Sequence, residues 1–343
     1  MNSLPGTRIV LALGMLLLSS NTALAEDGEQ SLVETTPHFA FYSDFATNLN
    51  DALIAAGSAR NDDAPELFHN GSEEESCFLD LPSSVRTGWD LAVDYYAKVI
   101  SPNSWLGRQQ YLLRADLAGF DQEFDAGARR FIEIAQGIRM AATPAYEACR
   151  WSLQDAENRR WIDELIPQLS AHESAIAGRL EQLYQTPWHD LPIRVDIVYA
   201  ALPVGANTID TPPHSLISSS IEDSDQLEIV LHEASHTLMR RNDPMQQALA
   251  EAARELDMEL PRDLWHVVLF YTTGETVRRI LEEDGELAYS PYMYRYNMWN
   301  GRWGEYRDAI EKTWPAYLDG QRTLPQAASD LLQALAETKG NSH

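Results

Sequence analysis

The segment from Ile193 to Arg241 constrains the fold of this chain more than any other, because its pattern changes from that of strands to that of a helix. Ile193–Tyr199 alternates apolar and polar side chains, which is typical of a strand with one buried face. Pro203–Asn207 is turn-like, and Ser215–Ser219 is expected to pair back as the second strand of a hairpin. The segment therefore predicts a small antiparallel sheet.

A helix is expected directly after this sheet. It opens near Asp223 or Ser224, with Gln226 placed as a capping-box partner of Asp223. It runs to Arg241, and Pro244 ends it because proline cannot continue a helix. Further helices are expected at about Met245–Met258 and Pro261–Glu283.

The N-terminal part of the chain has a mainly helical pattern. A short strand is expected at His38–Tyr42, a helix at Asp44–Ala56 and a loop at Gly57–Glu75. From Ser83 to about Ser174 the pattern is helical throughout. We therefore expect a mainly helical α+β protein with two parts, a helical N-terminal region at 26–187 and a second region at 188–343 that begins with the small sheet.

The N-terminus has the three parts of a secretory signal peptide. Arg8 is the positive charge, Ile9–Leu18 is an apolar run too short to span a bilayer, and Ala23-Leu24-Ala25 is a cleavage site before Glu26. No later stretch approaches the roughly 18 apolar residues that a membrane-spanning helix needs. We expect cleavage after Ala25, no membrane insertion of the mature chain, and a periplasmic or secreted location.

The net charge of −26 at pH 7 bears on the partners of this chain. Binding to nucleic acid requires a basic surface that neutralises phosphates, and so does attraction to anionic membranes. The sequence offers no such surface, so we expect no nucleic-acid partner.

Two cysteines, Cys77 and Cys149, follow the signal segment. In an oxidising compartment they can form one disulfide, and two separate buried thiols are the alternative. Two distant cysteines cannot build a thiolate metal site, so any metal ion would be held by histidine and carboxylate.

The predicted helix after the sheet contains His232-Glu233-Ala234-Ser235-His236. Residues four apart lie on one face of a helix, so His232 and His236 can present two imidazole nitrogens to one Zn²⁺ ion. Glu233 is then placed to accept a proton from a water molecule that the zinc ion activates. The pattern predicts a hydrolytic zinc site with one metal ion per chain.

Through His232, Glu233 and His236 this stretch resembles the zincin superfamily of metallopeptidases. The resemblance implies a peptide or protein substrate and a zincin-like catalytic region at 188–343. The continuation typical of metzincins is absent, because Met239 stands at the glycine position and Asn242 at the third histidine position. A gluzincin-like arrangement, with a third ligand from a later helix, stays open.

Three residues compete to be this third ligand. Glu275 is preferred, because it lies in the apolar helix that begins at Leu264, where a buried carboxylate needs a cation. His266 lies in the same helix, nine residues earlier, and about 180° around it, so both cannot face one metal ion in a straight helix. Glu255 is the third candidate, in a segment that reads as a solvated helix face.

The residues around the motif have possible further roles. Tyr271 or His266 is expected to donate a hydrogen bond to the oxyanion that forms during hydrolysis, and a core role for Tyr271 is the alternative. Ser215–Ser219 is a candidate edge strand for an extended peptide. The aromatic loop Tyr289–Trp303 either packs onto the core, which we favour, or forms a wall of the cleft. The rival function is a non-catalytic zinc-binding helical envelope protein, in which a fourth protein ligand closes the site.

Overall fold

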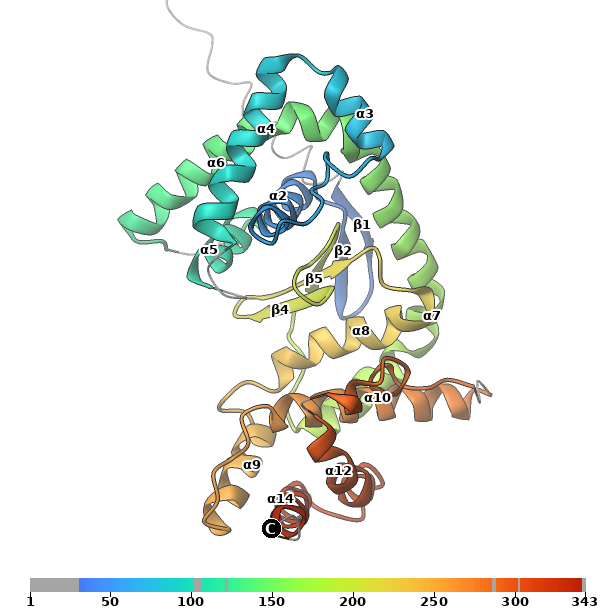
Figure 1. The fold of residues 1–343 in the computed structure, drawn as a ribbon. Helices are drawn as coiled ribbons and strands as arrows, with labels where there is room; N and C mark the ends of the chain where they lie inside the picture. Colours follow the sequence, from blue (N-terminus) through green and yellow to red (C-terminus); the bar gives the residue numbers. More distant parts are fainter. Residues whose placement is uncertain (1–30, 102–106, 121–122, 286–287, 302, 341–343) are drawn as a thin grey trace, which may run out of the picture.

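The computed structural model describes residues 31–101, 107–120, 123–285, 288–301 and 303–340. The predicted signal peptide lies outside these ranges. The chain is mainly helical with one small sheet, as the α+β prediction requires (Figure 1). In Figure 1 the sheet lies between the N-terminal helices above and the C-terminal helices below, and the long helix α7 runs along the side of both.

The sheet has five strands in the order β1-β2-β3-β5-β4. Their bounds are β1 Leu32–Thr35, β2 Phe39–Tyr42, β3 Ile193–Val198, β4 Ala206–Asp210 and β5 Pro213–Ser218. The three central strands, β2, β3 and β5, are parallel, whereas the outer strands β1 and β4 are antiparallel to their neighbours. The sheet is therefore mixed, and the prediction of an antiparallel sheet is wrong.

The predicted hairpin between Ile193–Tyr199 and Ser215–Ser219 is also wrong. These segments pair in parallel, with Val195 opposite Ser215. The true hairpin partner of β5 is β4, which overlaps the segment read as turn-like. The physical reason is burial, since all but Arg194 in β3 are buried, as in an interior strand with both faces covered. β5 is interior as well, so β4 and not Ser215–Ser219 is an edge strand.

The predicted N-terminal helices are present, and they surround a core of their own that includes Leu53, Trp89, Tyr96 and Tyr146. Asp44 caps the first of them by accepting a hydrogen bond from Thr47 N at 2.8 Å. The elements are α2 Phe45–Asn61, α3 Glu73–Asp80, α4 Ser83–Tyr95, the π-helical turn η1 Tyr96–Ile100, α5 Arg108–Leu117, α6 Ala126–Tyr146, the π-helical turn η2 Glu147–Trp151 and α7 Ser152–Tyr184. The predicted loop 57–75 is shorter than expected, because α2 and α3 extend into it.

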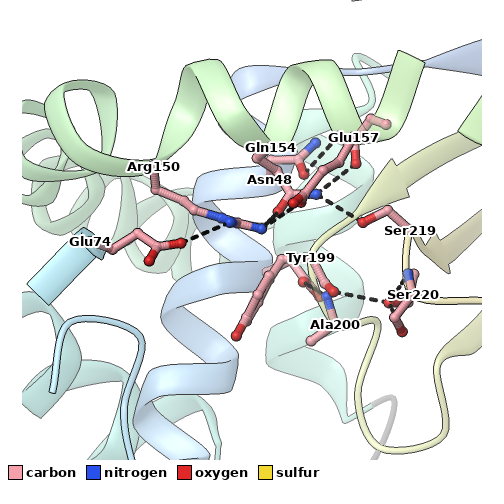
Figure 2. Close-up of polar contacts among 12 residues, drawn as sticks. Asn48, Glu74, Arg150, Gln154, Glu157, Tyr199, Ala200, Ser219 and Ser220 are labelled. Atoms are coloured by element: carbon pink, nitrogen blue, oxygen red, sulfur yellow. Dashed lines mark hydrogen bonds and ion pairs between the residues drawn. The ribbon is translucent and has the colours of Figure 1, made fainter. Parts of the chain in front are cut away.

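A disulfide joins Cys77 of α3 to Cys149 of η2, which decides the alternative that the sequence left open. Beside it, Arg150 lies between the carboxylates of Glu74 and Glu157, at 3.0 and 2.7 Å, and also bonds Gln154 (Figure 2). Gln154 in turn donates to Ser219 just after β5, at 3.1 Å. These contacts fix the start of α7 against the carboxyl ends of the parallel strands.

The C-terminal half continues with helices that pack below the sheet. Their bounds are α8 Asp223–Ser235, the 3₁₀ turn η3 His236–Leu238, α9 Pro244–Glu255, α10 Leu264–Glu283, α11 Tyr292–Arg295, η4 Met298–Asn300, η5 Gly304–Tyr306, α12 Arg307–Thr313, α13 Pro315–Leu318 and α14 Leu324–Gly340. Helix α8 ends six residues before the predicted Arg241. The predicted capping box is not formed, because Glu222 is the N-cap residue and its side chain makes no capping hydrogen bond.

The main hydrophobic core crosses the predicted boundary at 187/188. It combines Phe39 and Phe41 of β2 and Trp161 of α7 with residues of α8 and α10 such as Leu231 and Val268. The two predicted parts thus share the sheet and the main core, and the N-terminal helices add a second core. Within the described ranges, none of the helices has the length and apolar content needed to cross a bilayer.

Candidate metal centre

His232 and His236 lie one turn apart at the end of α8, on the side facing α10. His232 is 2% exposed in the last full turn of α8, and His236 opens the 3₁₀ turn η3. Their rings are 5.1 Å apart between centroids. Apolar residues on the same helix, Leu231 and Ala234, anchor this segment in the main core, so the two imidazoles have a fixed position.

His266, in the first turn of α10, completes a cluster of three imidazoles. Its Nε2 atom is 3.4 Å from Nε2 of His232. One ligand nitrogen from each of His232, His236 and His266 can be chosen so that all three lie within 4.8 Å of one another. Among the described residues, these three histidines form a group that could hold a metal ion.

Aromatic side chains surround the three imidazoles. Phe270 packs on the His232 ring at a centroid distance of 3.6 Å. Trp265 stacks on His266 at 4.9 Å, and Trp303 meets the same ring edge-on at 5.3 Å. Such a shell limits the access of water and strengthens electrostatic interactions inside it.

Burial determines the charge state of the histidines. Burial, together with the neighbouring imidazoles, lowers the pKa of His232 well below its usual value and that of His236 to about 3. The His232 and His236 rings are therefore neutral at pH 7, which is the form that binds a metal ion.

The three imidazoles can hold a metal ion, and zinc is one that binds such nitrogen ligands. Two nitrogens bound to one tetrahedral zinc ion at about 2.0–2.1 Å lie about 3.4 Å apart, which is the separation of the His232 and His266 Nε2 atoms. Three protein ligands also leave a fourth position open, as catalytic zinc sites do. The Nδ1 atom of His232 is buried without a hydrogen-bond partner among the described residues, whereas the second ring nitrogen of a zinc-binding histidine commonly donates to a carboxylate, a carbonyl or a water molecule.

Glu233 lies next to His232 and turns toward the sheet. Its Oε2 accepts a hydrogen bond from the hydroxyl of Thr208 in β4, at 2.7 Å. The Thr208 hydroxyl also contacts that of Ser215, at 2.8 Å. Burial raises the pKa of the Glu233 carboxyl to about 7, although the Thr208 hydrogen bond and the charge of Arg114 oppose this rise.

Glu275, the preferred third ligand from the sequence, does not join the cluster. Its carboxylate binds Arg278 at 2.9 Å and lies 3.6 Å from Arg279, one turn further along α10. These arginines compensate the buried charge, so Glu275 does not need a metal ion for this purpose. His266, the second candidate, takes the place beside the two α8 histidines. Glu255 is exposed at the end of α9 and lies outside the cluster as well.

Tyr271 is buried on the Glu275 side of α10. Burial raises its pKa, and the nearby carboxylates of Glu275 and Glu311 raise it further. This position separates Tyr271 from the histidine cluster and agrees with the core role that was its alternative. His266 was the other candidate for the hydrogen bond to the oxyanion. It is one of the three candidate metal ligands instead. In the aromatic loop, Trp299 and Trp303 both pack in the main core, and Trp303 also borders His266.

Two residues near the candidate centre, Thr208 and Glu228, were not predicted from the sequence. Thr208 was missed because the strand Ala206–Asp210 was read partly as a turn, although Asn207-Thr208-Ile209 carries two β-branched residues. Glu228, one turn before His232, is fully buried and accepts hydrogen bonds from Tyr289 Oη and Tyr292 N. A lone glutamate within an otherwise apolar helix turn was the available signal.

Comparisons with known proteins do not place the chain in a family. No protein-family model matches it, and neither a curated protein nor a solved structure matches it.

Proposed function

We propose that this protein is an exported zinc-dependent hydrolase that cleaves peptide bonds. One observation carries the proposal, which is the convergence of His232, His236 and His266 within 4.8 Å, with Glu233 adjacent in the chain. Three imidazoles beside a carboxylate are the groups that water-activating zinc sites use.

The chemistry follows from the roles of these groups. When bound by the three imidazoles, zinc supplies Lewis acidity and lowers the pKa of a water molecule toward 7. Thr208 occupies Oε2 of Glu233, so Oε1 is the atom that we assign to proton transfer. Oε1 accepts a proton as water attacks the carbonyl carbon, and it delivers a proton to the leaving amine.

A peptide substrate is favoured by the strand next to Glu233. β4 is an outer strand of the sheet, and extended peptides bind to such edges through main-chain hydrogen bonds. The resemblance of the His232–His236 segment to zincins points to the same class of substrate.

An exported location is supported by the disulfide between Cys77 and Cys149, since such bonds persist in oxidising compartments. It agrees with the predicted signal peptide.

The test combines metal analysis with peptide hydrolysis. We expect one zinc ion per chain in the wild type and in Glu233→Gln, and loss of zinc in His232→Ala and His266→Ala. Hydrolysis of a broad peptide library should fall by at least about 100-fold in Glu233→Gln. His69→Ala, which alters a half-exposed histidine in the N-terminal half, is the matched control and should retain both properties.

The outcomes separate this proposal from its rival. Zinc without any hydrolysis would favour a purely structural or binding site. Zinc retention in His266→Ala would contradict the assignment of His266 as a ligand, and absence of zinc from the wild type would contradict both functions.

A further inference from the structure

A pocket of about 330 Å³ opens beside the histidine cluster. Thr208 and Asp210 of β4 line one side, His236 and Trp265 border the candidate metal centre, and Arg240 and Arg241 line another part of the wall. Thr208 also binds Glu233, so the wall of this pocket includes one candidate ligand, His236, and the hydrogen-bond partner of the candidate base.

The two arginines owe their position to the end of α8. The helix stops at Ser235, and the chain turns through η3 before α9 begins at Pro244. Arg240 is held in this turn by Asp243, which accepts hydrogen bonds from Arg240 N at 2.8 Å and from its Nε at 3.3 Å. Arg240 is therefore oriented and partly neutralised.

Arg241 differs from Arg240 because its charge is not compensated. Its side chain is exposed, and across the described parts of the chain no carboxylate forms an ion pair with it. The chain has 52 acidic residues against 26 lysines and arginines. The described ion pairs engage many of the other arginines, including Arg150, Arg194 and Arg278.

A guanidinium group binds carboxylates through two parallel hydrogen bonds, and such charge-assisted pairs are stronger than neutral ones. We propose that Arg241, supported by Arg240, binds a carboxylate of the substrate in this pocket. This inference rests on the proposed function and narrows it to peptides that carry a negative charge close to the cleaved bond. That charge is either an acidic side chain or the C-terminal carboxylate.

The experiment uses one set of peptides in four forms. Each peptide carries either Glu or Gln at a given position and ends in either a free acid or an amide. Hydrolysis is measured with the zinc-loaded wild type, and binding is measured by calorimetry in the zinc-loaded Glu233→Gln protein, in which turnover is blocked. Arg241→Gln is introduced into both backgrounds, and Arg130→Gln, an exposed arginine of α6, is the control.

We expect removal of the recognised carboxylate to weaken binding and kcat/KM by about 10-fold to 100-fold. Arg241→Gln should cause the same loss for the charged peptide and change the neutral one by less than about twofold. Sensitivity to Glu→Gln identifies a side chain as the source, and sensitivity to amidation identifies the C-terminus. Arg130→Gln should change neither quantity.

Equal binding of all four forms would overturn the inference, and so would an equal effect of Arg241→Gln on charged and neutral peptides. Neither result would affect the proposed hydrolysis, which the wild type reports separately. If the wild type cleaved none of the peptides, the proposed reaction would fail, while the calorimetric comparison would still decide whether Arg241 binds a carboxylate.

Discussion

Thr208 is the residue through which the sheet reaches the candidate base. Its hydroxyl carries one proton, so when it donates to Glu233 the contact with Ser215 must be a bond donated by Ser215. Thr208→Val keeps the shape of the side chain and removes the bond to Glu233. We predict a decrease in kcat of about 10-fold to 100-fold, because a hydrogen bond to a carboxylate contributes about 1.5–3 kcal/mol. Steady-state kinetics and zinc titration measure the effect.

Ser215→Ala is the matched control for Thr208→Val. It removes the neighbouring hydroxyl and leaves the bond between Thr208 and Glu233 in place. We expect its kcat to stay within about threefold of the wild type, and zinc affinity to be unchanged in both variants. A Thr208→Val protein that binds zinc weakly would contradict a role confined to positioning Glu233.

Glu228 makes the stability of the metal-free protein depend on pH. Burial raises the pKa of its carboxyl to about 7, against the hydrogen bonds from Tyr289 and Tyr292. Between pH 4.5 and 7 the unfolded chain therefore loses this proton while the folded chain keeps it. The free energy of unfolding falls as pH rises through this range, by up to about 3 kcal/mol for this group.

Glu228→Gln removes this titration and keeps an oxygen that can accept both hydrogen bonds. We predict that the variant gains up to about 3 kcal/mol of stability relative to the wild type when pH is raised from 5 to 8. Urea denaturation of the metal-free proteins at several pH values measures this difference. Glu133→Gln, which alters an exposed carboxylate of α6, should show no such trend. A Glu228→Gln curve parallel to that of the wild type would rule out the raised pKa.

The choice between His266 and Glu275 shows what could be inferred residue by residue. The motif placed His232, Glu233 and His236 together because local helix geometry suffices for that. The third candidate ligand depends on which face of α10 meets α8, which is a property of tertiary packing. Burial alone suggested Glu275, yet Arg278 and Arg279 lie at the i+3 and i+4 positions, where they can pair with it. The arginine spacing is therefore a better guide to the partner of Glu275 than its burial, because these side chains compensate its charge without a metal ion.

The approach of α10 to α8 depends on Gly274. A Cβ atom at this position would lie 2.7 Å from Oε1 of Glu228 and 2.9 Å from Cβ of Pro291. Gly274→Ala should force the two helices apart and destabilise the protein by about 1–3 kcal/mol. Because His266 lies on α10, we also predict weaker zinc binding. Thermal unfolding and competitive zinc titration test both effects.

Gly137 provides the opposite case on α6, since a Cβ atom there would meet nothing within 4 Å. Gly137→Ala should stabilise the protein by up to about 1 kcal/mol through helix propensity, without a change in zinc affinity. If both alanine variants behaved alike, close packing at Gly274 would not be what positions α10.

The elements themselves differ in how far the sequence predicts them. Helical periodicity identified α2, α9 and α10 to within a few residues, because that pattern is local. The strand at His38–Tyr42 was predicted too, but its pairing with β3 was not. Phe39 lies opposite Ile193 in the sheet, and nothing in either segment specifies so distant a partner. Two short strands that are near in sequence suggested a hairpin, and the intervening β4 made the pairing of β3 and β5 parallel instead.

At the scale of the whole molecule, the N-terminal helices and the candidate centre are connected through the sheet. β2 links the N-terminal part to β3, and α7 packs on both α8 and α10. The N-terminal helices keep a separate core around Trp89 and Tyr146, and the disulfide lies on that side. The disulfide therefore stabilises the N-terminal core directly, whereas the main core depends on side-chain packing.

Removal of the disulfide tests whether the N-terminal core and the candidate metal centre are independent of each other. Cys77 and Cys149 are 72 positions apart, so their bond restricts a long loop of the unfolded chain and should stabilise the fold by about 4 kcal/mol in the chain-entropy description. We predict that Cys77→Ser/Cys149→Ser lowers the free energy of unfolding by this amount, while its zinc affinity in the folded state matches that of the wild type. Reductant should reproduce the loss in the wild type and leave the double variant unchanged. Weaker zinc binding by the folded variant would instead show that strain in the N-terminal core reaches α8 and α10 through α7.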